Sequence, residues 1–170
     1  MDLVILAGGK GSRIRHLNRS MPKPMVKINN IPFLELLINH YAKFNFENIF
    51  ILAGYKGKII KKRLFGKIQN FTKIRCIIEK TPKDTGGALQ LLKKKIKKDF
   101  FLINGDTFFD ISNPLSLINN FNNKNIGILS LVRQSNTNSI KFNNLRLDKN
   151  KNITATVKKY LDKKFWKYYV

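Results

Sequence analysis

Short, nearly continuous apolar runs alternate along the chain with longer segments in which apolar residues recur every three or four positions. A continuous apolar run is typical of a strand buried on both faces, whereas the wider spacing is typical of a helix with one buried face. The apolar runs predict strands at residues 3–6, 48–54, 73–79, 100–105 and 126–133. The wider spacing predicts helices at residues 32–44, 58–65, 86–98 and 113–121.

This alternation predicts an α/β fold with a mostly parallel sheet that helices cover on both faces. In such a sheet, ligands bind beyond the carboxyl ends of the strands. The pattern changes after Ser135, because residues 139–159 alternate around the turn-forming sequence DKNKN and predict a β-hairpin. We expect one domain over residues 1–170, with a core at 1–134 followed by a hairpin and tail at 135–170.

The charge balance is strongly basic. Thirty-three Lys and Arg residues against ten Asp and Glu give a net charge of +23. Such a charge favours anionic partners, which include nucleotides, nucleic acid and membrane surfaces. The lysines are spread along the chain and Asn and Ile are also abundant, so a genome rich in A and T explains the charge at least as well.

The single cysteine and the first residues argue against a disulfide-bonded, zinc-binding, secreted or membrane protein. Cys76 is the one cysteine, which excludes an internal disulfide and a zinc site built from cysteines, and its apolar surroundings predict a buried structural thiol. Asp2 stands where a signal peptide carries a base, and no apolar run approaches the roughly 20 residues of a membrane helix. We therefore expect a cytoplasmic protein with no membrane partner.

A glycine-rich basic loop directly follows the first predicted strand. The N–H groups of Gly8, Gly9 and Gly11 can converge on phosphate oxygens, and Arg13 adds a planar cation suited to phosphate. Lys23 lies between two prolines, which predicts a stiff extended segment. The spacing matches neither the Walker pattern nor Gly-x-Gly-x-x-Gly. A glycine pair alone is more often a simple turn, but the added cations favour a polyphosphate-binding loop.

Two further segments lie at the same predicted edge of the sheet. Asp106 ends the fourth predicted strand, where a carboxylate can hold Mg²⁺ among phosphates. Alternatively, Asp106 or Asp110 caps the following helix. Glu79 follows the third strand and can accept hydrogen bonds from guanine, or equally pair with a neighbouring lysine. After it, a helix is expected to open with free N–H groups at Thr85, Gly86 and Gly87.

Several of these segments occur in a familiar order. LAGGKGSR, PKPMVKI, PFLE, GY, E…P…TGGAL and LINGDTFFDI, all within residues 1–111, resemble the sugar-1-phosphate nucleotidylyltransferase family. The resemblance implies a Rossmann-like, mixed and mostly parallel sheet of the nucleotide-diphospho-sugar transferase type. It also implies the reaction of an NTP, with GTP expected, and a sugar 1-phosphate to give an NDP-sugar and pyrophosphate, with Mg²⁺ as cofactor. Such a reaction serves the synthesis of surface polysaccharide and lipopolysaccharide precursors.

The resemblance also implies roles for individual residues. Arg13 would hold the β- and γ-phosphates, Lys23 would lie near the α-phosphate and the sugar phosphate, and Asp106 would hold Mg²⁺. These three are the expected catalytic residues. The expected nucleotide-binding residues are Leu6, Ala7, Gly8, Gly9, Gly11, Ser12, Arg13, Glu79, Thr85, Gly86, Gly87 and Gly105.

The sequence departs from the family in two places. Residues 82–85 are Pro-Lys-Asp-Thr where the family has Pro-Leu-Gly-Thr. Lys158 and Lys159 fall near an expected Glu-Lys pair, the later Asn-Gly-Gly segment is absent, and Asp162 is a poor substitute for the family's late Asp. We therefore expect an incomplete sugar-binding part in this chain.

These departures leave two alternatives to the enzyme. One is a non-catalytic nucleotide-binding or regulatory paralogue, and the other is a nonspecific nucleic-acid binder. No zinc-finger spacing or aromatic-basic RNA-binding strand is present, so specific nucleic-acid binding is not expected. The aromatic tail KFWKYYV could pack on a second copy in a homo-oligomer, although packing on its own sheet is the more ordinary use.

Overall fold

The computed structural model describes residues 1–11, 20–64, 66–81, 84–109, 113–114, 116, 131–132, 144–150, 152–157 and 166–168. The chain divides into two compact units, residues 1–113 and residues 114–170. In the part of the chain described here, no helix is long and apolar enough to cross a membrane.

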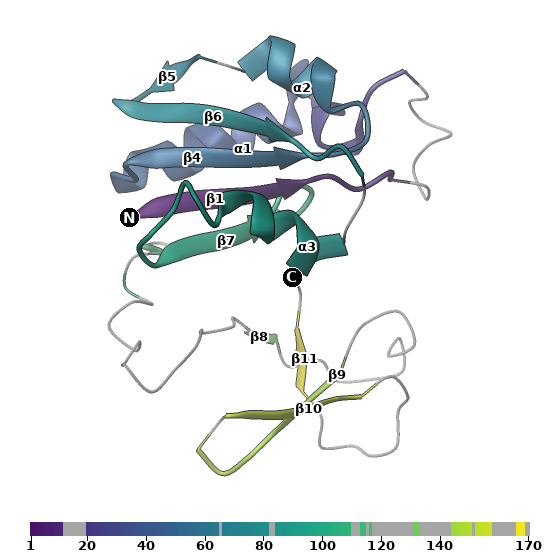
Figure 1. Ribbon diagram of the computed structural model, residues 1–170, viewed down its shortest axis with the longest axis vertical. Helices are drawn as coiled ribbons and strands as arrows, with labels where there is room; N and C mark the ends of the chain where they lie inside the picture. The colour runs from purple at the N-terminus through teal and green to yellow at the C-terminus, as the bar shows by residue number, and fades with distance from the viewer. Residues whose placement is uncertain are drawn as a thin grey trace. The chain divides into compact units, whose positions relative to one another are not determined.

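The first unit is built on a five-stranded sheet with the order β5-β6-β4-β1-β7 (Figure 1). Its strands are β1 (Asp2–Ala7), β4 (Asn48–Ala53), β5 (Ile68–Gln69), β6 (Thr72–Ile78) and β7 (Phe100–Asn104). Neighbouring strands are parallel except that the short edge strand β5 is antiparallel to β6. The four strands that were predicted in this unit, and the mostly parallel sheet, are confirmed.

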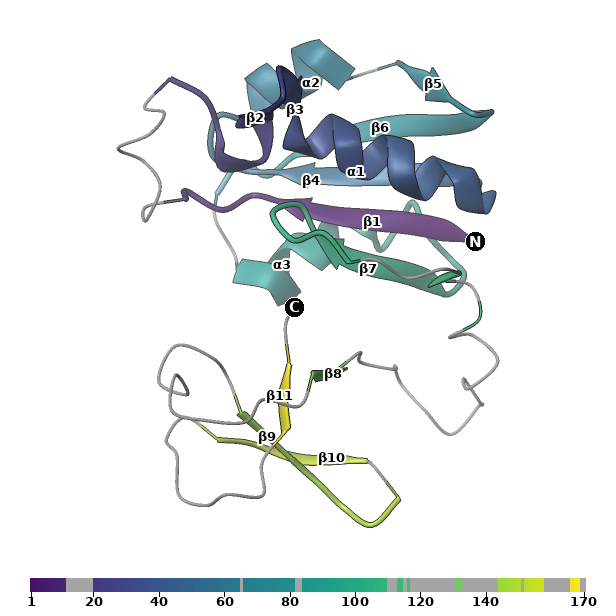
Figure 2. The same ribbon diagram turned by 180° about the vertical axis from the view of Figure 1, so that it is seen from behind.

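Both faces of the sheet are apolar because the central strands are buried on both sides. Val4, Phe50 and Leu52 pack with Ala88 and Leu92, which belong to the helical segment after β6. Side chains alternate along a strand, so the neighbouring residues of β1 and β4 point to the opposite face. Helices α1 (Phe33–Tyr41) and α2 (Gly57–Leu64) lie on that opposite face (Figures 1 and 2).

The helical cover of the other face is shorter than the sequence predicts. The expected helix over residues 86–98 is observed as α3 (Asp84–Leu89) followed by a 3-10 turn, η4 (Gln90–Leu92), and irregular turns. Gly86 and Gly87 lie within α3 and do not explain its early end. The lysines of residues 93–98 repel one another along a continued helix, and Asp99 is the one acidic residue a turn away from any of them. Helix α1 is also shorter than predicted and continues as η3 (Ala42–Phe44).

A small hairpin that was not predicted precedes α1. It consists of β2 (Lys27–Ile28) and β3 (Ile31–Pro32), joined by Asn29 and Asn30 with φ of 48° and 65°. Asparagine tolerates this left-handed conformation better than most residues, as two-residue hairpin turns require.

The second unit contains an antiparallel sheet with the order β10-β9-β11-β8. Its strands are β8 (Leu131–Val132), β9 (Asn144–Leu147), β10 (Ile153–Val157) and β11 (Trp166–Tyr168). Strands β9 and β10 confirm the predicted hairpin, whereas β11 was not predicted. Of the strand expected at residues 126–133, only β8 is described, and most of the helix expected at residues 113–121 lies outside the described residues.

The turn of this hairpin is closed by one carboxylate. Asp148 accepts hydrogen bonds from the backbone N–H groups of Asn150 and Asn152, at 2.9 and 2.8 Å, and from the Asn152 side-chain amide at 2.9 Å. The hydrogen bonds from Asn152 are the main reason that the pKa of Asp148 is lowered from its ordinary value.

Candidate functional site

The carboxyl ends of β1 and β7 are joined through a glycine. The Gly105 N–H donates a hydrogen bond to the Leu6 carbonyl oxygen at 2.8 Å. A Cβ atom at Gly105 would lie 2.9 Å from that oxygen, which is too close for an ordinary contact. The bare backbone at residue 105 therefore places Asp106 beside the start of the glycine loop, where Ala7 is buried and Gly9 is exposed.

The turn after β4 holds the other side of the loop. The Tyr55 N–H donates to the Gly8 carbonyl oxygen at 3.1 Å. A Cβ atom at Gly54 would lie 2.7 Å from the same oxygen and 2.9 Å from the Gly8 Cα. The two turns thus pack backbone against backbone, and Gly54 belongs to the site although sequence reasoning gave it no role. Its signal in the sequence is the GY segment (Gly54 and Tyr55) at the end of a neighbouring strand, which is part of the family resemblance.

Lys23 and Asp106 form an ion pair at this edge of the sheet. Both side chains are about one-third exposed, and Asp106 also accepts a hydrogen bond from the Thr107 hydroxyl at 3.2 Å. Residues 107–109 are not helical, so Asp106 does not cap a helix, and Asp110, the other candidate cap, lies outside the described residues. The predicted catalytic lysine and the predicted metal-binding carboxylate are therefore brought together across 83 positions of sequence.

The backbone around Lys23 differs from the extended segment that its two prolines predict. Lys23–Met25 forms a 3-10 turn, η2, in which the Met25 N–H donates to the Pro22 carbonyl at 2.8 Å. The fixed φ of Pro24 fits the first turn of a helix as well as an extended chain. Gly11, with φ of 60°, packs so closely that a Cβ there would lie 2.7 Å from the Lys23 Cβ. The glycine loop therefore packs at Gly11 against the aliphatic part of the Lys23 side chain.

Lys56 binds the chain at Ser20, where the glycine loop ends. No role was predicted for Lys56 from the sequence. Its ammonium donates a hydrogen bond to the Ser20 carbonyl oxygen at 2.9 Å. Because Tyr55 contacts Gly8, the turn after β4 binds the chain on both sides of residues 12–19. Ser12 and Arg13, which were predicted to bind phosphate, lie outside the described residues.

Glu79 lies beside the glycine loop. Its backbone N–H donates to the Ala53 carbonyl at 2.7 Å, and its carboxylate Oε2 would lie 3.5 Å from a Cβ placed at Gly8. Thr85 and Gly86 are exposed at the start of α3, and Gly87 is half-buried. Within the described residues these three form no hydrogen bond with residues 8–11, and their nucleotide-binding role stays a prediction.

The donor set at this edge suits one kind of metal. Among the residues that the structure describes, no three His, Cys, Asp or Glu side chains gather as a metal site. Asp106 is a single carboxylate, and one or two carboxylates together with substrate phosphates are what Mg²⁺ takes in phosphoryl-transfer enzymes. The residues therefore fit Mg²⁺ held jointly with a nucleotide, and they do not fit a zinc site made by the protein alone.

The fold and this edge define the class of protein as a nucleotide-binding α/β protein. The nucleotidyl transferase family model matches residues 3–163, and the chain belongs to that family. The predicted family resemblance and fold class are confirmed.

Two curated relatives illustrate the match. The chain is 38% identical over 111 residues to D-glycero-alpha-D-manno-heptose 1-phosphate guanylyltransferase of Campylobacter jejuni, covering 65% of this chain and 50% of that protein. It is 34% identical over 146 residues to the bifunctional protein GlmU of Methanococcus aeolicus, covering 80% of this chain and 34% of that protein. The chain thus spans about half the length of the heptose guanylyltransferase that it matches.

A solved structure extends the likeness to three dimensions. HddC from Yersinia pseudotuberculosis, in complex with GMP-PN, superimposes with a TM-score of 0.74 at 28% identity. The match covers 98% of this chain and 72% of that one. The inositol-1-phosphate CTP transferase of T. maritima, at 17% identity and a TM-score of 0.65, shares the fold.

Proposed function

We propose that the chain is an enzyme that transfers GMP from GTP to a sugar 1-phosphate, releasing pyrophosphate, in the synthesis of surface polysaccharide and lipopolysaccharide precursors. The observation that carries the proposal is the Lys23–Asp106 ion pair next to the glycine loop. It combines a cation for phosphate with a carboxylate for Mg²⁺ at the carboxyl edge of a parallel sheet, where such folds bind ligands.

The choice of guanine rests on Glu79 and on the relatives. A carboxylate beside the Gly8 backbone can accept two hydrogen bonds from the N1–H and 2-amino group of guanine. Adenine presents no such pair of donors. A heptose 1-phosphate guanylyltransferase is among the similar proteins, which is consistent with the same donor nucleotide here.

In the proposed reaction, a phosphate oxygen of the sugar 1-phosphate attacks the α-phosphorus of GTP. The new P–O bond forms as the bond to the β-phosphate oxygen breaks, and pyrophosphate leaves. The attacking group is already an anion, so no protein base is required. Bound Mg²⁺ would neutralise phosphate charge.

The task of the protein is to bring two anions together and to stabilise the leaving group. The backbone N–H groups of Gly8, Gly9 and Gly11 would bind the nucleotide phosphates, with Arg13 on the β- and γ-phosphates. Lys23 would lie between the α-phosphate and the incoming sugar phosphate and reduce their repulsion. We also propose that the enzyme acts in the cytoplasm, because its proposed donor GTP is a cytoplasmic nucleotide.

The first test is pyrophosphate release by the purified chain with Mg²⁺, each of five nucleoside triphosphates and a panel of sugar 1-phosphates that includes heptose and mannose. We expect release with GTP and one sugar. Lys23→Ala should lower turnover by on the order of 10²-fold or more, as loss of a transition-state donor does. Lys94→Ala, an exposed lysine outside the site, should leave turnover unchanged.

The same assay separates the alternatives. GTP binding without turnover for any sugar would support a non-catalytic nucleotide-binding protein instead of the enzyme. Equal turnover of Lys23→Ala and Lys94→Ala would contradict the role proposed for Lys23. Binding that depends on salt alone, without preference among polyanions, would support the nonspecific nucleic-acid binder.

A further inference from the structure

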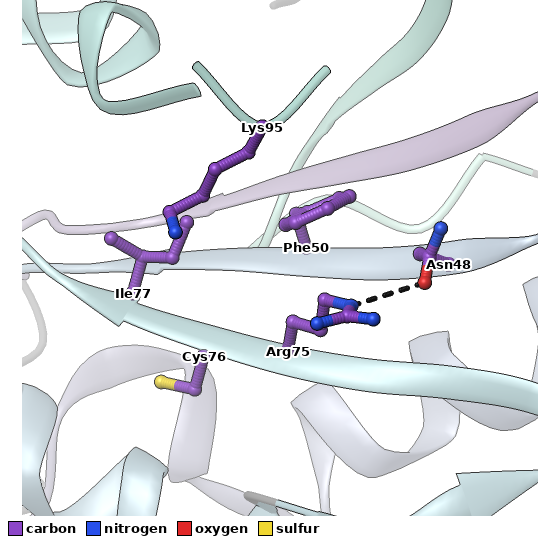
Figure 3. A pocket seen from close by; sticks show the side chains of 6 residues that line it. All are labelled: Asn48, Phe50, Arg75, Cys76, Ile77 and Lys95. Atoms are coloured by element: carbon purple, nitrogen blue, oxygen red, sulfur yellow. Dashed lines mark hydrogen bonds between the residues drawn. The ribbon is translucent and has the colours of Figure 1, made fainter. Parts of the chain in front are cut away.

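A cavity of about 380 Å³ lies on the sheet face that α3 covers, and the residues that line it do not include the glycine loop. Its lining residues are Asn48, Phe50, Arg75, Cys76, Ile77 and Lys95 (Figure 3). Asn48 begins β4, whereas the glycine loop follows the carboxyl end of β1. The volume falls in the lower part of the range for small-molecule sites, roughly 300–1,000 Å³.

The cavity exists because the helical cover of this face ends early. Helix α3 and η4 together end at Leu92, and only Ile96 from the following turns joins the apolar cluster over Phe50 and Ile77. Beyond that cluster, Arg75 of β6 is exposed, and Lys95 reaches toward Ile77 from the opposite side of the cavity (Figure 3). The site thus has an apolar floor and a cationic rim.

The guanidinium of Arg75 is held in place by a chain of hydrogen bonds. The Asn48 side-chain amide donates to Asp2 Oδ1 at 2.7 Å, and Arg75 Nε donates to Asn48 Oδ1 at 3.1 Å. Both polar atoms of the Asn48 amide therefore have partners, and the amide oxygen holds the Nε side of the Arg75 guanidinium. The other edge keeps its paired N–H donors, the geometry that binds a phosphate or carboxylate with two hydrogen bonds.

The cations of this rim lack acidic partners. Within the described part of the chain, neither Arg75 nor Lys95 forms an ion pair with a carboxylate. Lys73, the register partner of Asn48, is exposed on the same face of β6 as Arg75 and adds a third positive charge. Uncompensated cations around an apolar floor favour an anion that carries an apolar body.

We propose that this cavity is a second ligand site, separate from the nucleotide loop, for a small organic phosphate with a planar or apolar body. Arg75 binds the phosphate with two N–H groups and Lys95 adds a further contact. Half-buried Ile77 forms the surface on which the body rests, and Phe50, which is 4% exposed, lies at the base of the cavity. The proposal shares no residue with the nucleotidyl transfer site, so it stands or falls independently of the proposed function.

Titration of the ¹⁵N-labelled chain tests the proposal, with phenyl phosphate, inorganic phosphate and phenol as separate probes. We expect phenyl phosphate to shift the amide signals of Phe50, Arg75 and Ile77 in a saturable way. Inorganic phosphate should bind at the same residues at least tenfold more weakly, and phenol should not saturate. Arg75→Gln should weaken phenyl phosphate binding at least tenfold, whereas Lys94→Gln, in the same turn as Lys95 but outside the lining, should not.

Four results would overturn the proposal. Phenyl phosphate could shift only the glycine-loop signals, or it could bind Arg75→Gln as tightly as Lys94→Gln. Phenol binding as tightly as phenyl phosphate would exclude the phosphate contact. Equal affinity for inorganic phosphate and phenyl phosphate would exclude the contribution of the apolar floor. The spectrum of each variant reports directly on whether it is folded.

Discussion

At the residue scale, the glycines at the sheet edge show which contacts the site requires. Gly54→Ala would place a methyl group 2.7 Å from the Gly8 carbonyl oxygen and 2.9 Å from the Gly8 Cα. Both are backbone atoms, so they can move away only if the whole glycine loop shifts. We expect a loss of about 1–3 kcal/mol, as for other overpacked positions, measured by denaturant unfolding. Gly9→Ala is the matched control, because nothing lies within 4 Å of its Cβ. Equal losses in the two variants would contradict this account.

Cys76 offers a second prediction at this scale. Its side chain is 7% exposed, and burial raises the pKa of its thiol to about 11. At pH 8 about one thiol in a thousand would then be ionised, against about a quarter for a free cysteine. We expect iodoacetamide to alkylate the folded chain roughly 100-fold more slowly than the chain in denaturant.

The alkylation rate of Cys76 should also rise with pH. Because the raised pKa keeps the thiol neutral, the rate in the folded chain should increase about tenfold per pH unit up to pH 10. A rate that levels off near pH 8.5 would mean that Cys76 titrates like a free cysteine.

At the scale of elements, the hairpin between β5 and β6 carries a residue in an unfavourable conformation. Gln69 pairs with Thr72, so Asn70 and Phe71 form a two-residue turn with φ of 47° and 65°. Phe71 is 98% exposed, so its ring contributes little packing while its backbone adopts a conformation that glycine adopts readily.

Phe71→Gly should therefore raise the free energy of unfolding by about 0.5–1 kcal/mol, or the midpoint of thermal unfolding by about 1–4 °C. Phe71→Ser removes the same ring but keeps a Cβ, and it should give no comparable gain. If both variants were stabilised alike, the cause would be the loss of the exposed ring instead of the backbone conformation.

The elements also show how far sequence reasoning reaches. Strands such as β4 were predicted because a strand buried on both faces leaves a continuous apolar run. The helix after β6 was predicted too long, because apolar spacing does not register the mutual repulsion of the lysines at residues 93–98. The sequence predicted that Lys23 and Asp106 lie at the same edge of the sheet. Lys23 follows the loop after β1, and Asp106 follows the end of β7.

Other parts of the site left no such pattern. Gly54 and Lys56 contact backbone atoms of Gly8 and Ser20, so no side chain at the partner positions marks these contacts, although Gly54 belongs to the GY segment of the family resemblance. The cavity at Arg75 depends on where a helix ends, which is the feature that sequence patterns predict least well.

At the scale of the whole molecule, the net charge of +23 should make stability depend on salt. The ion pairs of the described residues join partly or largely exposed side chains, and exposed pairs contribute about 0–1 kcal/mol each. Repulsion among cations acts over the whole chain, and its range shrinks from about 30 Å at 0.01 M salt to about 8 Å at 0.15 M. Added salt should therefore stabilise this protein, although it weakens each ion pair.

We expect the midpoint of thermal unfolding to rise by about 2–4 °C between 10 and 150 mM NaCl, which corresponds to about 1 kcal/mol for a chain of this size. KCl should give the same rise, because screening depends on ionic strength and not on the cation. The combined variant Lys93→Gln, Lys94→Gln, Lys97→Gln removes three charges from one exposed basic segment and should show a smaller rise. A midpoint that falls with salt would mean that the ion pairs outweigh the repulsion, and an unchanged slope in the variant would mean that the rise does not come from this segment's charge.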